Sequence, residues 1–226
     1  MPRFIVNGIA LNIPGRHLTP PLREALETGR YEQSEAAALE RHLRDGDRFL
    51  DLGAGAGYLV ALAALRLGVE AIAGVEGDPE MAEVARRTVN RATGADATVE
   101  AGAVVPTGFS GSSVEFVRRG GFWASSLPVA DEAGQARLTV AALPLEELLA
   151  RHRPSVLCVD IEGGEAELFD RPLPTHVRLV ILELHPKRYG ASGVRRIFDG
   201  LSAAGMAYCP AGSRGATVVF ERVSPE

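Results

Sequence analysis

A glycine-rich segment between two apolar runs constrains the fold of this chain more than any other feature. Residues 49–58 read FLDLGAGAGY, in which an apolar run of strand length leads into three alternate glycines. An apolar run of helix length, 59–67, follows, and a second strand-length run, 71–75, ends at Glu76. A strand, a sharp glycine turn, a helix and a second strand form a β-α-β unit, the unit with which α/β proteins bind nucleotides.

The acids beside this turn indicate which nucleotide is bound. Glu76 lies 23 residues beyond Gly53 (76 − 53), close to the roughly 20-residue offset of the acid that binds a ribose in dinucleotide folds. Asp51 precedes the first glycine, and its carboxylate would repel a pyrophosphate, whereas it suits the amino group and sulfonium of S-adenosylmethionine. The pattern D-x-G-x-G-x-G, closing in Gly57, looks like the first motif of class I methyltransferases. Three alternatives stay open: a glycine turn without a ligand, a nicotinamide-dependent oxidoreductase and a non-catalytic nucleotide-binding protein.

The predicted cofactor-binding residues come from several parts of the chain. At Gly53 and Gly55 a side chain would occupy the volume of the ligand, so the backbone can approach it closely. Glu32 precedes a helix, where a side chain can lie over the methionine moiety, and the small residues at 101–103 suit a flat adenine. The predicted set is Glu32, Asp51, Gly53, Ala54, Gly55, Gly57, Tyr58, Glu76, Gly77, Gly102, Ala103 and Asp160.

Composition and charge bound the class of protein. The chain has 226 residues, 46% of them hydrophobic, which is enough for a full core. Its net charge of −5 provides no broad basic surface, so nucleic acid is not an expected partner. We find no signal peptide and no membrane-length apolar run, and we expect two buried free thiols, Cys158 and Cys209, in a cytoplasmic protein that can oligomerise.

The remaining patterns predict a Rossmann-like α/β fold, with a seven-stranded, mostly parallel sheet and helices on both faces. Residues 1–30 carry two short apolar segments around Asn7-Gly8, followed by turn signals at Pro14-Gly15 and Pro20-Pro21. This pattern is typical of a ribbon, and we interpret the segment as an N-terminal ribbon or lid extension. The main domain is expected to span 31–226. Its helices are predicted at 31–43, with Ser34 as a cap, and at 59–67, 79–94, 145–150 and 192–204. Further strands are predicted at 97–105, 114–117, 156–164, 177–184, 206–209 and 216–222, and the strand at 156–164 closes in acids.

Two strands of this sheet end in chemically useful side chains. Ligands of open α/β sheets bind outside the carboxyl ends of the strands. Because positions two apart in a strand point to one side, Asp160 should pair with Glu162 and Glu183 with His185. We predict these four residues as catalytic, with His185 or Glu183 as the base that takes a proton from an alcohol. We assign no metal ligands, although the same residues could instead hold a divalent cation. The other histidines are expected on the surface, and Trp123 in either a structural or a substrate-stacking role.

With these motifs in view, the chain resembles the FkbM family of S-adenosylmethionine-dependent methyltransferases over about residues 31 to 208. The resemblance rests on DLGAGAG (51–57), VEGDP (75–79), VDIEGGE (159–165) and the stretch 143–149. It implies a class I methyltransferase fold, S-adenosylmethionine as donor and often O-methylation of a sugar or polyketide-like natural product. It also implies that Asp160, Glu162 and Glu165 belong to the site. The predicted acceptor is therefore a hydroxyl of a small metabolite, sugar or natural product.

Overall fold

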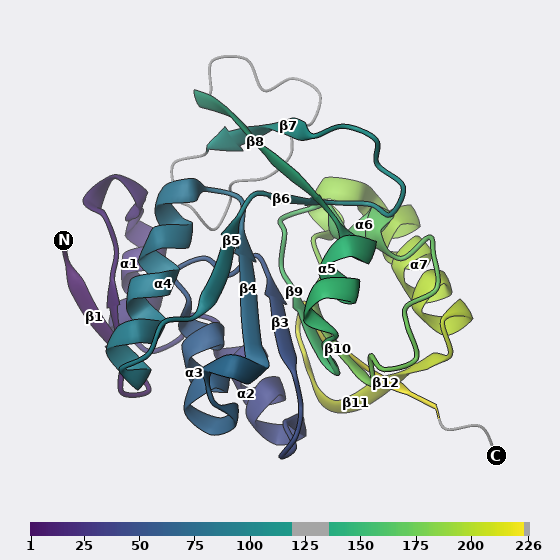
Figure 1. Cartoon of the computed structure of the whole chain (residues 1–226), viewed down its shortest axis with the longest axis horizontal. Helices are drawn as coiled ribbons and strands as arrows, with labels where there is room; N and C mark the ends of the chain where they lie inside the picture. Colours follow the sequence, from purple (N-terminus) through teal and green to yellow (C-terminus); the bar gives the residue numbers. More distant parts are fainter. Residues whose placement is uncertain (119–135, 224–226) are drawn as a thin grey trace.

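The computed structural model of the protein describes residues 1–118 and 136–223, and a seven-stranded sheet lies at its centre (Figure 1). The strand order is β11-β12-β10-β9-β3-β4-β5. The strands β5, β4, β3, β9 and β10 run parallel, and β12 pairs antiparallel with both of its neighbours. The bounds are β3 Phe49–Leu52, β4 Ile72–Glu76, β5 Thr98–Ala101, β9 Val156–Val159, β10 Leu179–Glu183, β11 Met206–Arg214 and β12 Thr217–Arg222. The predicted seven-stranded, mostly parallel sheet is confirmed.

Helices cover both faces of the sheet because its central strands are apolar on both sides. Along β9, Val156 and Cys158 pack into one core, whereas Leu157 and Val159 pack into the other, as expected for strands buried on both faces. The first core is closed by α2 (Gln33–His42), α3 (Tyr58–Leu67) and α4 (Pro79–Thr93). The second is closed by α5 (Leu145–His152), α6 (Glu165–Leu168) and α7 (Pro186–Ala203).

Local sequence signals explain where several helices begin and end. In α4, Pro79 occupies the first turn, the Asp78 side chain accepts a hydrogen bond from Glu80 N at 2.9 Å, and Gly94 adopts the left-handed conformation just after the last turn. The prediction that Ser34 caps α2 is wrong. The residue before this helix is Glu32, which has a left-handed φ of 48° and makes no side-chain cap.

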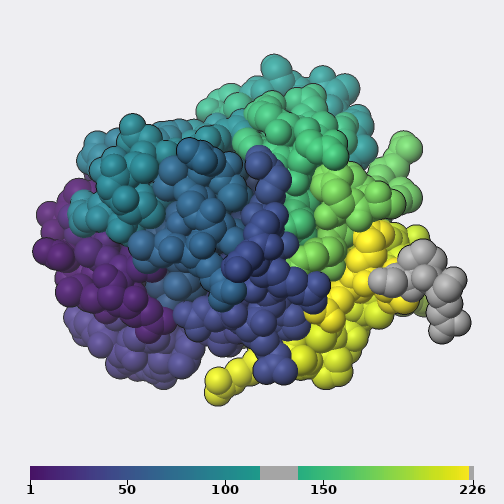
Figure 2. Space-filling view, turned by 60° about the horizontal axis from the view of Figure 1, so that its bottom comes forward, coloured from purple at the N-terminus to yellow at the C-terminus, as the bar shows by residue number. Residues whose placement is uncertain are grey.

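The N-terminal segment forms the predicted ribbon and, in addition, an unpredicted helix. Strands β1 (Arg3–Val6) and β2 (Ile9–Asn12) pair antiparallel around Asn7-Gly8. After a short 3-10 turn, η1 (Gly15–His17), helix α1 (Pro20–Glu27) starts at the two prolines that had indicated a turn, because proline is also favoured in a first helical turn. The segment packs against the helices that follow it, as its purple surface shows in Figure 2.

The segment after β5 leaves the main sheet and forms a small sheet of its own. The predicted third strand splits at Gly102, and its second part, β6 (Ala103–Val105), pairs with β8 (Ala136–Pro144), which also pairs with β7 (Ser113–Arg118). These three strands extend above the carboxyl ends of the main strands (Figure 1). The predicted strand at 114–117 is confirmed, whereas β8 was not predicted. Trp123 lies outside the described residues.

Several boundaries near the C-terminus differ from the prediction. Helix α7 begins at Pro186 rather than Ser192, and non-helical Gly190 interrupts it. Strand β11 continues to Arg214 across an irregular register, so the turn is shorter than predicted. Cys158 is a buried free thiol and Cys209 a half-buried one. No helix in the described ranges is long and apolar enough to cross a bilayer.

Candidate functional site

The glycine turn connects β3 to α3, and its three glycines all have positive φ: 98°, 51° and 79° at positions 53, 55 and 57. A Cβ on Gly53 would lie 1.7 Å from the carbonyl oxygen of Asp160. A Cβ on Gly57 would lie 2.7 Å from the Cα of Ala85 in α4. We expected glycine at position 53 because a side chain would occupy the volume of the ligand. The structure corrects this reason, because the backbone at the end of the neighbouring strand already excludes a side chain there.

Glu76, at the end of β4, holds this turn in place. One of its carboxylate oxygens accepts a hydrogen bond from Gly55 N at 2.8 Å, and the other accepts one from Asp78 N at 2.8 Å. The side chain is buried, which raises the pKa of its carboxyl to about 7. A carboxylate has about four acceptor sites, so Glu76 can still accept hydrogen bonds from a ribose in the adjoining cavity.

A cavity opens beside the turn. Its apolar wall includes Phe116 of β7, which lies so close to Gly77 that a Cβ there would be 2.4 Å from the Phe116 ring. Nothing in the sequence marked Phe116, since only the small sheet brings β7 to this place. The lining consists of Tyr31, Glu32, Gly53, Gly55, Val75, Glu76, Gly77, Gly102, Ala103, Val104, Phe116, Asp160, Ile161, Glu162 and Gly164.

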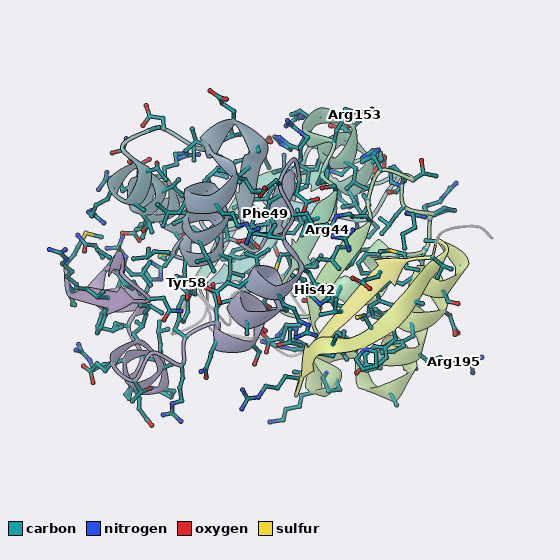
Figure 3. The ribbon with its side chains drawn as sticks, turned by 90° about the horizontal axis from the view of Figure 1, so that it is seen from below. His42, Arg44, Phe49, Tyr58, Arg153 and Arg195 are labelled. Carbon is teal, nitrogen blue, oxygen red and sulfur yellow. The ribbon has the colours of Figure 1, made fainter. Side chains whose placement is uncertain are left out.

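Most predicted cofactor residues line this cavity, but Asp51, Ala54, Gly57 and Tyr58 are not in its lining. Asp51 lies inside the sheet beside Cys158, where burial raises its pKa to about 7. The Tyr58 hydroxyl accepts a hydrogen bond from Asn7 Nδ2 at 2.6 Å and so ties α3 to the N-terminal ribbon (Figure 3). A contact of these residues with a cofactor stays a prediction.

The four predicted catalytic residues come together at the carboxyl ends of β9 and β10. His185 Nε2 lies 3.6 Å from Asp160 Oδ1 and 3.5 Å from Glu162 Oε2, and Glu183 is close enough to interact with Asp160. The way in which these residues come together differs from the prediction, which assumed that both strands stay extended through them. The chain turns after Val159, and Glu162 has a left-handed φ of 57°, so a turn rather than strand alternation pairs Asp160 with Glu162.

Glu165 contacts both the turn after β9 and His185. Only the family resemblance had implicated this residue. It is fully buried, and its carboxylate accepts hydrogen bonds from Ile161 N at 2.8 Å and Gly163 N at 2.9 Å. Its Oε1 also lies 3.3 Å from His185 Nδ1. Glu165 thus fixes both the turn and the orientation of the imidazole.

Burial and mutual repulsion control the protonation of this cluster. Burial raises the pKa of Asp160 well above its ordinary value, and the charges of Glu183 and Glu162 raise it further. Burial likewise raises the pKa of Glu183, and that of Glu162 to about 7. Burial disfavours the imidazolium of His185, but the hydrogen bond and charge of Glu165 and the nearby carboxylates outweigh this effect and raise its pKa.

A second cavity adjoins the first. The two share the wall formed by Tyr31, Glu32, Asp160 and Glu162. The second cavity is otherwise lined by α2 and its approach, by the end of β10 and by the β11–β12 turn, including Glu35, Glu183, Arg30 and Arg214. Carboxylates therefore outnumber arginines along its walls.

The other histidines do not join this site, and not all of them are exposed as expected. His17 is buried and pairs with Glu80 at 2.8 Å. His42, seen beside β11 and β12 in Figure 3, is also buried, and its two ring nitrogens contact Ala211 O at 2.7 Å and Glu221 Oε1 at 3.0 Å. Both fasten separate segments of the fold together.

Comparisons with known proteins match the part of the chain that contains the glycine turn. The family model of ribosomal protein L11 methyltransferase (PrmA) matches residues 28–108. The ribosomal protein L11 methyltransferase of Thermus thermophilus is 46% identical over 69 residues, which are 30% of this chain and 26% of that protein. The match thus spans about a quarter of the length of this curated relative. None of these matches supports the narrower FkbM assignment.

Solved structures resemble the whole chain in fold. Trm1 from Pyrococcus horikoshii, solved with S-adenosyl-L-methionine, has a TM-score of 0.53 at 11% identity and covers 98% of this chain and 61% of its own. The ribosomal protein L11 methylase of Lactobacillus delbrueckii subsp. bulgaricus has a TM-score of 0.47 at 15% identity, covering 86% and 80%. The likeness to Trm1 shows that the chain has the Rossmann-like fold of class I S-adenosylmethionine-dependent methyltransferases.

Proposed function

We propose that the protein is an S-adenosylmethionine-dependent methyltransferase that methylates a hydroxyl of a small metabolite, sugar or natural product. One observation carries the proposal: the cavity beside the glycine turn shares its wall of Tyr31, Glu32, Asp160 and Glu162 with a second cavity. A donor in the first and an acceptor in the second would meet at this wall. Methyl transfer needs this arrangement, because much of its catalysis consists of holding the nucleophile in line in a site without water.

The first cavity fits the donor in its polar groups. Glu76 offers acceptors for a ribose, and the flat surface of Gly77, Gly102 and Phe116 suits an adenine. The half-buried carboxyls of Glu32 and Asp160 suit a positively charged sulfur and amino group, since a cation stabilises a carboxylate that burial disfavours. When bound, S-adenosylmethionine supplies an activated methyl group, whose carbon–sulfur bond breaks with both electrons going to sulfur.

The residues of the chain then act on the acceptor. Its hydroxyl oxygen forms the new bond to carbon, and its proton passes to His185 Nε2 or to Glu183. Either group is a suitable base, because neighbours and burial raise its pKa above the ordinary value.

A second acceptor deserves a direct test, because the matched relatives are named for ribosomal protein L11. The matched segment, residues 28–108, contains the glycine turn and Glu76 but ends before Asp160, Glu162, Glu183 and His185. The match therefore supports the donor side of the site and says little about the acceptor side.

Calorimetry and methyl transfer test this proposal together. We expect S-adenosylhomocysteine to bind with a Kd on the order of micromolar and NAD not to bind. Labelled methyl groups should pass from S-adenosylmethionine to hydroxylated small molecules and not to purified ribosomal protein L11. His185→Ala should lower transfer by about 10²- to 10⁴-fold without changing S-adenosylhomocysteine affinity.

The matched control is His152→Ala, because His152 pairs with Glu100 and does not line either cavity. Its transfer rate should equal that of the wild type. Absence of S-adenosylhomocysteine binding by folded protein would refute the proposal, and methylation of ribosomal protein L11 alone would replace the acceptor.

A further inference from the structure

The cluster around His185 contains more charge of one sign than its own hydrogen bonds can stabilise. Asp160, Glu162, Glu165 and Glu183 surround one imidazole, and the charge of Arg188 acts on Glu162 as well. Asp160 Oδ1 is buried and has no hydrogen-bond partner among the described residues. A buried carboxylate oxygen without a partner is costly, so this atom indicates a missing positive ligand.

The distances within the cluster are those of metal ligands rather than of hydrogen bonds. Asp160 Oδ1 and Glu162 Oε2 lie 3.6 and 3.5 Å from the same atom, His185 Nε2, too far for good hydrogen bonds. Ligands about 2.1 Å from one ion stand about 3.0 Å apart in octahedral and about 3.4 Å apart in tetrahedral geometry. The distances of both carboxylate oxygens from His185 Nε2 are thus within a few tenths of an ångström of the spacing between ligands of one ion.

The other nitrogen of the imidazole is buried and makes no hydrogen bond of good geometry with a described residue, but it faces a carboxylate of the kind that a metal-binding histidine uses. His185 Nδ1 faces Glu165 Oε1 at 3.3 Å, and two backbone N–H groups hold that carboxylate in place. A histidine that binds a metal almost always donates its remaining N–H to a carboxylate, carbonyl or water, which fixes its tautomer. Glu165 is thus a positioning residue that leaves Nε2 free to bind.

We propose that Asp160 Oδ1, Glu162 Oε2 and His185 Nε2 bind a divalent first-row metal ion, such as Mn²⁺, at the junction of the two cavities. One imidazole with carboxylates suits such an ion better than Mg²⁺, which prefers oxygen ligands. Its further role rests on the proposed function: an acceptor hydroxyl on the ion would lose its proton more easily. Because the ion occupies His185 Nε2, Glu183 is then the base.

A second cluster provides an internal comparison. His42, Cys209 and Glu221 also gather potential ligand atoms, but both ring nitrogens of His42 already contact protein oxygens. It has no free nitrogen to offer. We therefore expect binding at His185 and none at His42.

Titration of metal-free protein with Mn²⁺ tests the proposal, with free Mn²⁺ followed by electron paramagnetic resonance. We expect one site with a Kd on the order of micromolar. His185→Gln and Glu162→Gln should each weaken it at least tenfold. Glu165→Gln should weaken it by about 10- to 100-fold and alter the coupling between Mn²⁺ and the imidazole nitrogen, whereas His42→Gln should bind as the wild type does. S-adenosylhomocysteine calorimetry checks that each variant is folded.

Wild-type protein gives a readout that needs no variant. Pulsed electron paramagnetic resonance of the Mn²⁺-loaded protein should show coupling to an imidazole nitrogen. Binding without that coupling, equal binding by all variants, or no binding at all would overturn the metal site. Methyl transfer that persists in EDTA would overturn the role of the ion with the acceptor and leave the proposed function intact. Conversely, Mn²⁺ binding by a protein that does not bind S-adenosylhomocysteine would refute the proposed function and leave the metal site intact.

Discussion

The two sides of the cavity system hold their carboxylates in opposite ways. On the donor side, backbone N–H groups satisfy both oxygens of Glu76. On the acceptor side, Asp160, Glu162 and Glu183 mainly face one another and His185. The first arrangement is complete within the protein, whereas the second becomes favourable only when a proton or another cation joins it. The donor side is thus a preformed binding surface, whereas the carboxylates of the acceptor side repel one another until a proton or another cation binds.

The largest expected effect is at Gly53, where the glycine turn of the donor side meets the backbone of Asp160 on the acceptor side. Gly53→Ala would place a Cβ against the Asp160 carbonyl at a φ of 98°, so we expect a loss of about 3 kcal/mol or more in the free energy of unfolding. Gly94→Ala is the control, because Gly94 also has positive φ but nothing lies within 4 Å of its Cβ position, and it should lose only about 1 kcal/mol. Urea unfolding measures both. Equal losses would mean that the two sides do not touch at Gly53.

On the donor side, Glu76→Gln should weaken S-adenosylhomocysteine binding by about 10- to 100-fold. The amide can accept a hydrogen bond from only one of the two N–H groups, so the glycine turn loses a support and the ribose an acceptor. Calorimetry compares it with Glu83→Gln, an exposed change on α4, the helix that follows β4, which should leave the affinity unchanged. A normal affinity for Glu76→Gln would show that the donor side does not depend on this acid.

On the acceptor side, neutralising an acid should stabilise the protein. Burial and like charges raise the pKa of Glu162 from 4.5 to about 7, so between these pH values the folded state binds a proton that the unfolded state has lost. Stability from this group is present below pH 4.5 and is lost as the pH rises to about 7, with a maximum slope of about 1.4 kcal/mol per pH unit.

Glu162→Gln removes that slope. Because the side chain is partly exposed, we expect the metal-free variant to exceed the wild type by about 1–2 kcal/mol at pH 8 and by less at pH 5. Urea unfolding at both pH values measures the difference. A variant that is less stable than the wild type at pH 8 would contradict the idea that repulsion among the acceptor-side carboxylates destabilises the folded state.

The smallest expected effect lies outside both sides, where the ribbon meets α3. Tyr58→Phe removes the hydroxyl that accepts the Asn7 hydrogen bond and should cost about 1 kcal/mol. It should also expose residues 1–12 to proteolysis sooner, while S-adenosylhomocysteine affinity stays as in the wild type. A loss of affinity would instead place Tyr58 in the donor site, as its position in the sequence motif predicts.

Sequence patterns predicted much of the fold because its signals are local. The apolar runs ending in Glu76, Asp160 and Glu183 are strands that end at one edge of the sheet, and Pro79 and Gly94 bound a helix. Sequence patterns gave wrong predictions where one residue type occurs in two kinds of local structure. Pro20-Pro21 indicated a turn but opens α1, and His17 and His42 seemed polar surface residues but are buried with partners.

The sequence by itself determined that a β-α-β unit with a glycine turn and a terminal acid exists, because hydrophobic periodicity and glycine spacing are properties of neighbouring residues. Only the tertiary structure decided which side chains meet. It brings Phe116 against Gly77, sets the Asp160 carbonyl against Gly53 and aims two carboxylates at one nitrogen of His185. These contacts join residues far apart in the chain, and packing across the sheet, rather than local pattern, fixes their distances.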